Sequence, residues 1–270
     1  MVDQFPLSGH RLAVWALESG DLRQATSLAQ TLGLPLLTGA LKHQPADCIL
    51  LMVSTAGLGL QPLDRRSGAV RVDFIAGKVN HRRRFGGGQG QHIARAVGIK
   101  GVQRPSVLDL TAGFGTDSFV LAGLGCRVNL VERHPLVKLL LQDGLRRAAQ
   151  FIETASIVAR MQLHHDSARQ VLNQWCVEPP DVIYLDPMFP RVGKHASQGA
   201  ASKEMSLLRQ LVGVDADAEK LLQPALALAR YRVVVKRPRL APYLDNRQPA
   251  YQLIGKANRF DIHVIQSFSQ

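Results

Sequence analysis

From residue 107 onward the chain alternates short apolar runs with longer amphipathic stretches, and this alternation limits the possible folds more than any other sequence feature. Each apolar run has the length of a strand, and each stretch between runs is long enough for a helix. Such a pattern requires parallel strands joined by right-handed crossovers, so we predict an α/β fold with a mostly parallel, seven-stranded sheet. The strands are expected at residues 107–110, 127–131, 161–164, 182–185, 232–236, 251–254 and 260–265, and the helices at 116–124, 135–150, 167–174, 203–211 and 216–229.

Residues 98–106 interrupt this pattern with two glycines and a proline, which predicts a domain boundary near residue 100. Residues 101–270 then form the α/β domain, and residues 1–100 form a small α+β domain. In the small domain we expect a helix at 21–32, a strand at 49–53, and a half-buried strand at 69–75, where apolar and polar residues alternate.

Composition restricts the class of protein further. The chain has 270 residues, 46% of them hydrophobic, which is enough for the core of one full α/β domain and a smaller one. It shows no signal peptide and no apolar run of roughly 20 residues, so we expect a cytoplasmic protein without membrane segments. Its 3 cysteines are widely separated and its histidines lack metal-ligand spacing, so neither disulfides nor a metal site is expected.

The segment 181–190, DVIYLDPMFP, gives the strongest indication of chemistry. A buried strand here would deliver Asp186, Pro187 and Phe189 to its carboxyl end, where open α/β sheets bind ligands. The Asp186 carboxylate and the Pro187 carbonyl can accept hydrogen bonds from a nucleobase amino group while Phe189 stacks on the base. A carboxylate matches the two adjacent N–H donors of guanine better than the mixed edge of adenine, although this preference is modest and leaves adenine open.

The turn after the first α/β strand indicates a nucleotide-type cofactor. Gly113 and Gly115 allow a tight turn between strand and helix, and Asp109 and Asp117 place carboxylates around it. A carboxylate-rich turn suits the cationic amino-acid part of S-adenosylmethionine better than a pyrophosphate.

Two further strands are expected to end in acidic residues at the same edge of the sheet. Glu132 follows the second strand, about 20 residues past the glycines, where an acidic side chain accepts hydrogen bonds from ribose hydroxyls. Asp166 follows the third strand, where it either accepts a hydrogen bond from the adenine amino group or, with Ser167, caps the next helix.

Two basic clusters are candidates for contact with nucleic acid. The formal net charge of +12 favours a polyanionic partner, because basic surfaces gain affinity from counterion release at phosphates. Either cluster can instead be a solvated face of the protein. The first cluster is Arg82, Arg83 and Arg84, beside Phe85 and a glycine run, and the second is Lys236 and Arg237 at the end of the fifth strand.

Residues 186–189 resemble the (Asp/Asn)-Pro-Pro-(Tyr/Phe) loop of S-adenosylmethionine-dependent amino-methyltransferases, with Met188 at the second proline. Most of the chain resembles the RsmJ family of 16S ribosomal RNA guanine-N2 methyltransferases, over segments such as VDFIAGKVNHRRRFGGGQG, LDLTAGFGTDSFVLAGLGCRV, VERHPLV and VVVKRP. The resemblance implies a Rossmann-like class I S-adenosylmethionine-dependent methyltransferase acting on N2 of a guanine in 16S ribosomal RNA, free or in a small-subunit particle. It also implies cofactor contacts for Thr116, Asp117, Glu132, Arg133, Ser167, Ala168 and Asp186.

Two other interpretations stay open at this point. The protein could be a ribosome-assembly factor that binds RNA without catalysis, or an amino-methyltransferase acting on adenine or on a protein glutamine. An Asp186→Ala substitution separates the first from an enzyme, and the identity of the methylated product separates the second.

Overall fold

The computed structural model describes residues 11–39, 41, 48–63, 68–76, 88–164, 166–188, 203–213, 215 and 217–268. The chain forms two compact units: a larger one, Asp73–Phe189 with Asp215–Gln270, and a smaller one, Met1–Val72 with Pro190–Val214. In the described ranges, no helix is both long and apolar enough to cross a bilayer. The same ranges contain no cluster of His, Cys, Asp or Glu side chains suited to hold a metal ion.

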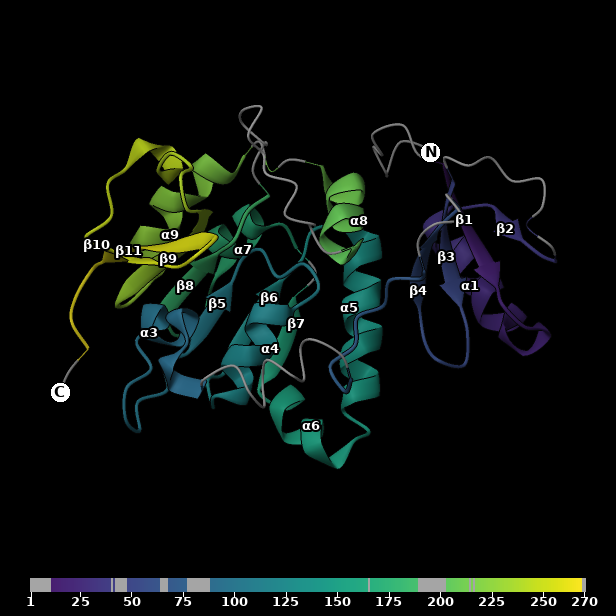
Figure 1. The fold of residues 1–270 in the computed structure, drawn as a ribbon, viewed down its shortest axis with the longest axis horizontal. Coiled ribbons are helices and arrows are strands. Elements are labelled where there is room, and N and C mark those ends of the chain that lie inside the picture. Colours follow the sequence, from purple (N-terminus) through teal and green to yellow (C-terminus); the bar gives the residue numbers. More distant parts are fainter. Residues whose placement is uncertain are drawn as a thin grey trace. The chain divides into compact units, whose positions relative to one another are not determined.

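The larger unit is built on a mostly parallel sheet of seven strands with the order β10-β11-β9-β8-β5-β6-β7 (Figure 1). The pairs β5–β6, β6–β7, β5–β8 and β8–β9 are parallel, whereas β11 is antiparallel to both β9 and β10. This confirms the predicted α/β fold. The strands are β5 (Val107–Asp109), β6 (Val128–Val131), β7 (Met161–His164), β8 (Val182–Leu185), β9 (Arg232–Pro238), β10 (Tyr251–Ile254) and β11 (Asn258–Val264).

Helices cover both faces of this sheet. One face carries α3 and α4, and α4 also contacts α6, which in turn packs against α5. The other face carries α7 and α9, which pack against each other over a core that includes Leu108, Ile183 and Val233. The elements are η2 (Gly88–Gly90), α3 (His92–Val97), α4 (Thr116–Gly123), α5 (Pro135–Ala148), α6 (Ile152–Val158), α7 (Ala168–Gln174), η3 (Ala218–Leu221), α9 (Leu222–Leu228) and η4 (Leu244–Asn246).

The smaller unit has a sheet of four strands in the order β2-β1-β3-β4, and α1 packs on β1 and β3. Here β1 is parallel to both β2 and β3, whereas β4 is antiparallel to β3. The elements are β1 (Arg11–Ala16), η1 (Ser19–Asp21), α1 (Leu22–Leu32), β2 (Leu36–Leu37), β3 (Cys48–Val53), β4 (Gly59–Pro62) and α8 (Lys203–Val212).

The predicted strand at 69–75 is wrong, although its alternation is real. Val70, Val72 and Phe74 are buried, but only Val70 forms a bridge, to Leu60. The extension stops because the Asp73 carboxylate accepts hydrogen bonds from the backbone N–H groups of residues 75 and 76, which bends the chain. Strand β1 and helix α6 were not predicted.

The two compact units divide the chain elsewhere than near residue 100. Helix α3 packs against α4, β9 and β11, and the Phe74 ring stacks on Phe119 of α4 with centroids 4.5 Å apart. These contacts join Phe74 and α3 to the larger unit. The helix predicted at 203–211, now α8, groups with the smaller unit instead.

Candidate active site

The strand order places a topological switch point at the carboxyl ends of β5 and β8, and the ligand-binding region expected there is called the crevice below. From β5 the chain proceeds outward through β6 and β7 on one side, then returns to β8 and β9 on the other. Two neighbouring parallel strands whose connections leave in opposite directions leave room for a ligand beyond their carboxyl ends.

Side-chain alternation brings a polar cluster to one face of the sheet at this edge. Asp109 pairs in register with Tyr184, and Leu185 pairs with Val235, so the next residues along, Asp186 and Lys236, are neighbours. The odd-even period places Asp109, Tyr184, Asp186 and Lys236 on the face opposite the Leu108–Ile183–Val233 core, together with Asp117 from the first turn of α4.

Lys236 joins two carboxylates of this cluster. Its Nζ lies 2.8 Å from Asp117 Oδ2 and 2.7 Å from Asp186 Oδ2. The buried Tyr184 hydroxyl donates to Asp117 Oδ2 at 2.8 Å. Burial raises the pKa of Asp186, and the Lys236 charge opposes that rise. The sequence pattern predicted neither Tyr184 nor this role of Lys236, although the period of two linking Tyr184 to Asp186 was a usable signal.

The loop after β8 is held on both sides. The Asp186 N–H donates to Thr111 Oγ1 at 2.6 Å. The Met188 N–H donates to Asp215 Oδ2 at 2.6 Å, and its carbonyl accepts from the Asp215 N–H at 3.0 Å. Pro187 is buried between these anchors. Asp215 was not predicted, and the expected stacking residue Phe189 lies outside the described residues.

The glycine turn between β5 and α4 has the backbone that its sequence requires. Gly113 and Gly115 have φ values of 54° and 72°, in the region that other residues rarely adopt. A Cβ on Gly115 would also lie 2.7 Å from Leu141 Cδ1 of α5. Thr116 follows as the first residue of α4.

Glu132 closes this turn from the end of β6. Its Oε2 accepts the Gly113 N–H at 2.9 Å, and its Oε1 accepts the His134 N–H at 2.7 Å. Burial raises the pKa of Glu132 to about 7. Each carboxylate oxygen can accept a second hydrogen bond, so Glu132 keeps acceptor capacity for a hydroxyl.

Asp109 lies beneath the turn instead of at its surface. Only 2% of the residue is exposed, and its carboxylate accepts the Ser118 hydroxyl at 2.5 Å and the Thr111 N–H at 3.0 Å. Burial raises its pKa to about 7. In the structure this side chain shapes the turn, and a direct contact of Asp109 with a cofactor stays a prediction.

At the end of β7 the structure separates two roles that the sequence left open. Ser167 is the N-cap of α7, and its Oγ accepts the Gln170 N–H at 3.2 Å. Asp166 is exposed, so its carboxylate stays accessible, while Ala168 is buried in the core. At the end of β6, Arg133 pairs with Asp215 and, at 2.9 Å, with Asp217.

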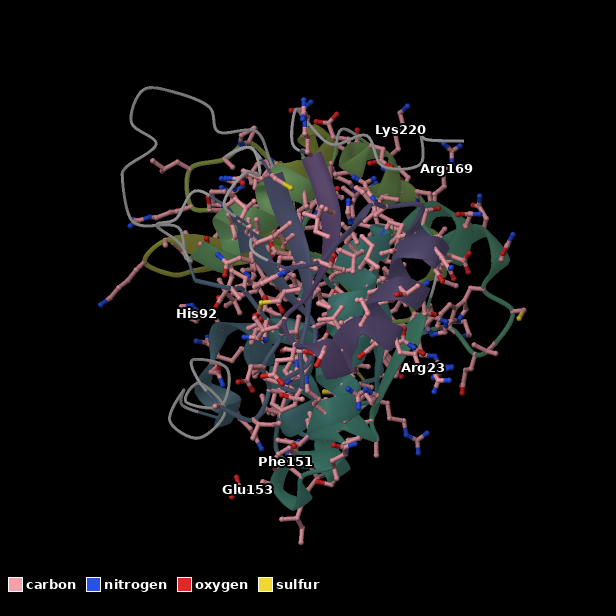
Figure 2. All side chains as sticks on the ribbon, turned by 90° about the vertical axis from the view of Figure 1, so that its right-hand side faces the viewer. Arg23, His92, Phe151, Glu153, Arg169 and Lys220 are labelled. Atoms are coloured by element: carbon pink, nitrogen blue, oxygen red, sulfur yellow. The ribbon has the colours of Figure 1, made fainter. Side chains whose placement is uncertain are left out.

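Of the two predicted basic clusters, the structure describes the one at the end of β9. Arg237 is only 4% exposed and donates from Nε to the Pro242 carbonyl at 2.9 Å, so its guanidinium holds the chain after β9. The expected RNA contact of Arg237 stays a prediction. Burial lowers the pKa of Arg237 to about 10. Arg82, Arg83 and Arg84 lie outside the described residues. Figure 2 shows Arg169 of α7 and Lys220 of η3, two exposed cations not considered from the sequence, projecting outward.

The chemistry of this edge fits a cationic nucleoside cofactor. Among the described residues, Lys236 supplies one positive charge between the carboxylates of Asp117 and Asp186, so acidic groups exceed cations at this edge. Such a site attracts a further positive charge, whereas a pyrophosphate would be repelled. Glu132 offers a buried acceptor for hydroxyl groups one strand away. Fold and site together define the class of Rossmann-like methyltransferases that use S-adenosylmethionine (SAM).

Comparisons with known proteins agree with this class. A family model described as "Putative SAM-dependent methyltransferase" matches residues 36–265. A protein named "Ribosomal RNA small subunit methyltransferase J" from Pseudomonas savastanoi is 52% identical over 95% of this chain and 92% of its own length. The protein of that name from Pseudomonas syringae pv. syringae is 53% identical with the same coverages. The chain therefore belongs to the ribosomal RNA small subunit methyltransferase J family of SAM-dependent methyltransferases.

A solved structure supports the fold over almost the whole chain. The crystal structure of a SAM-dependent methyltransferase from Neisseria gonorrhoeae is 34% identical, has a TM-score of 0.70, and covers 93% of this chain and 95% of its own.

Proposed function

We propose that this protein transfers a methyl group from S-adenosylmethionine to the exocyclic N2 of a guanine in 16S ribosomal RNA, free or within a small-subunit particle. The relatives' printed name supports small-subunit ribosomal RNA as the substrate. The observation that carries the choice of reacting group is the Asp186 carboxylate, which lies at the switch point of the sheet and is one-third exposed. A ribosomal RNA substrate also supports a cytoplasmic location for the protein.

Asp186 supports guanine as the target base. Guanine presents N1–H and the N2 amino group side by side, and a carboxylate accepts from both. The loop that carries Asp186 is fixed by Thr111 on one side and Asp215 on the other. Orientation of this kind is the main contribution that a protein can make to methyl transfer.

Bound S-adenosylmethionine supplies an electrophilic methyl carbon on a sulfonium sulfur. Asp186 and the Pro187 carbonyl hold the hydrogens of N2 so that its lone pair is directed at that carbon. When N2 gains the carbon, the bond from that carbon to sulfur breaks and S-adenosylhomocysteine leaves, while N2 loses one proton to the Asp186 carboxylate. Burial raises the pKa of Asp186, and a proton acceptor works best when its pKa lies near the operating pH. Phe189 stacks on the base.

The residues around the glycine turn hold the cofactor. Glu132 accepts hydrogen bonds from the ribose hydroxyls, and Asp117 lies toward the cationic amino-acid part. The exposed Asp166 accepts from the adenine amino group, since Ser167 already caps α7. Gly113 and Gly115 contact the cofactor through the turn itself. The family resemblance adds contacts by Thr116, Arg133, Ser167 and Ala168.

RNA is held by basic residues. The net charge of +12 supports a polyanionic partner, and Arg82, Arg83 and Arg84 are proposed phosphate contacts from residues 1–100, the segment proposed to touch RNA.

Transfer of tritiated methyl groups to purified small-subunit RNA tests the proposal. Asp186→Ala should lower the rate by at least about 100-fold while RNA affinity is retained, because the acceptor of the amino group is lost. Asp186→Asn should also lower it, because an amide presents a donor to one of the two guanine N–H groups. Glu178→Ala is the matched control: its side chain is 78% exposed and pairs with Arg230, away from the crevice.

The products separate the alternatives. Nucleoside digestion of labelled RNA should yield N2-methylguanosine. If the labelled product were methyladenosine, or if the label were found in protein, the target would not be guanine. Equal rates for wild type and Asp186→Ala would contradict the proposed role of Asp186, and full cellular function of that variant would favour an assembly factor.

A further inference from the structure

Lys236 occupies an unusual position for a residue expected to contact RNA. Its Nζ lies between Asp117 Oδ2 and Asp186 Oδ2, at 2.8 and 2.7 Å. The side chain is 20% exposed, against 11% for Asp117 and 33% for Asp186. An ammonium with two carboxylates in contact has little charge left for a phosphate, so its main interaction is within the crevice.

The three side chains come from different parts of the fold. Lys236 lies on β9, Asp117 in the first turn of α4, and Asp186 directly after β8. Under the proposed function, Asp117 faces the methyl donor and Asp186 faces the base. Lys236 is thus a direct link between the two halves of the reaction site.

We propose that Lys236 is a positioning residue, which keeps the Asp186 carboxylate ionised and directed at the amino group of the target base. The inference rests on the proposed function for its catalytic meaning. It does not make Lys236 a catalytic residue, because the ammonium acts through Asp186.

The surroundings of Asp186 explain why a cation is needed. Among the described residues, the other titratable groups that face it are acidic: Asp117 of α4, Asp109 of β5, Tyr184 of β8 and Asp215. The carboxylates disfavour a further negative charge, whereas Tyr184 stays neutral because its own pKa is raised. Burial and these neighbours raise the pKa of Asp186, whereas the Lys236 charge and hydrogen bond lower it. The pKa of Lys236 is itself raised, because the two carboxylates outweigh its burial. Lys236 therefore stays protonated at neutral pH.

Loss of this cation has a consequence that depends on pH. Without Lys236, Asp186 should be protonated over a wider range, and a protonated carboxyl can neither accept both guanine N–H groups nor take up a proton. Raising the pH should restore the carboxylate. A residue that only supported the fold would lower activity at every pH alike.

The test compares pH profiles of kcat/KM for methyl transfer to RNA. In Lys236→Met and Lys236→Gln the acidic limb should move upward by about 1 to 3 pH units, with at least about 10-fold loss at pH 7 that shrinks as pH rises. Lys236→Arg should keep most of the wild-type profile, because it retains the charge. Arg239→Met, which removes an exposed cation three residues along, is the control and should leave the limb in place.

A second measurement separates this inference from the proposed function. Titration of the Asp186 carboxyl by ¹³C NMR, assigned with Asp186→Asn, needs no substrate and should show a higher pKa in both neutral variants. An unchanged Asp186 titration in folded Lys236→Gln would overturn the inference whatever the activity. A raised Asp186 pKa in these variants, together with a wild-type protein that transfers no methyl group to RNA, would uphold the electrostatic role of Lys236 and refute the proposed function.

Discussion

Two buried carboxyl groups beside the glycine turn should make stability depend on pH. Asp109 and Glu132 are 2% and 7% exposed, and burial raises the pKa of each to about 7. The folded protein then keeps protons that the unfolded chain releases above about pH 4, so the free energy of unfolding should fall from about pH 4 to pH 7 and then level off. Urea unfolding across this range measures the slope. Asp109→Asn should flatten it, whereas Asp245→Asn, at an exposed carboxylate, should not; equal slopes in all three proteins would contradict the assignment.

At the scale of one element, the start of α7 depends on a capping box between Ser167 and Gln170. The Ser167 hydroxyl accepts the Gln170 N–H, and the Gln170 side chain accepts the Ser167 N–H at 3.3 Å. Ser167→Ala should lower the free energy of unfolding by about 1 kcal/mol, because a helix donor loses its partner. Asp166→Ala is the neighbouring control and should change it little. Calorimetry or urea titration measures the free energy of unfolding of both variants. An equal loss in the Asp166 and Ser167 variants would contradict the capping role of Ser167.

For the whole molecule, the net charge of +12 should appear as salt dependence of RNA binding. If Arg82, Arg83 and Arg84 each contact a phosphate of a single strand, replacing all three with glutamine should reduce the slope of log affinity against log salt by about 2. The control replaces three exposed arginines elsewhere in the chain, Arg23, Arg146 and Arg160, with glutamine, which lowers the net charge by the same amount. Filter binding between about 50 and 200 mM salt compares the two triples. Equal slopes for both would mean that overall charge, and not the 82–84 cluster, drives binding.

Particular elements show how far the sequence could be followed. Strands β7 and β8 have the predicted bounds, and α4 and α5 begin at the predicted residues. The glycine turn before Thr116 and the proline at position 135 are local signals for the two helix starts. Strand β1 and helix α6 were missed. The alternation at 69–75 predicts a strand because a buried extended segment has the same sequence pattern whether or not it pairs with a neighbouring strand. The turn at Asp73 shows that this segment does not continue as a strand.

In the candidate site, the sequence placed Asp117, Glu132 and Asp186 at strand ends or turns that share one edge, and the structure brings them there. It could not distinguish Lys236 from Arg237, which are adjacent in the chain. Their side chains point to opposite faces of β9, so Lys236 meets two carboxylates and Arg237 is buried against the Pro242 carbonyl.

The sequence by itself determined the α/β class, the strand ends that carry acidic residues, and the family, since each depends on local periodicity or on contiguous motifs. Only the tertiary structure decided which charges pair. Lys236 meets Asp117 across 119 residues and Asp186 across 50, and Asp215 holds Met188 across 27. Contacts at such separations are set by strand order and register, which follow from the free energy of packing the whole sheet and which no local pattern specifies.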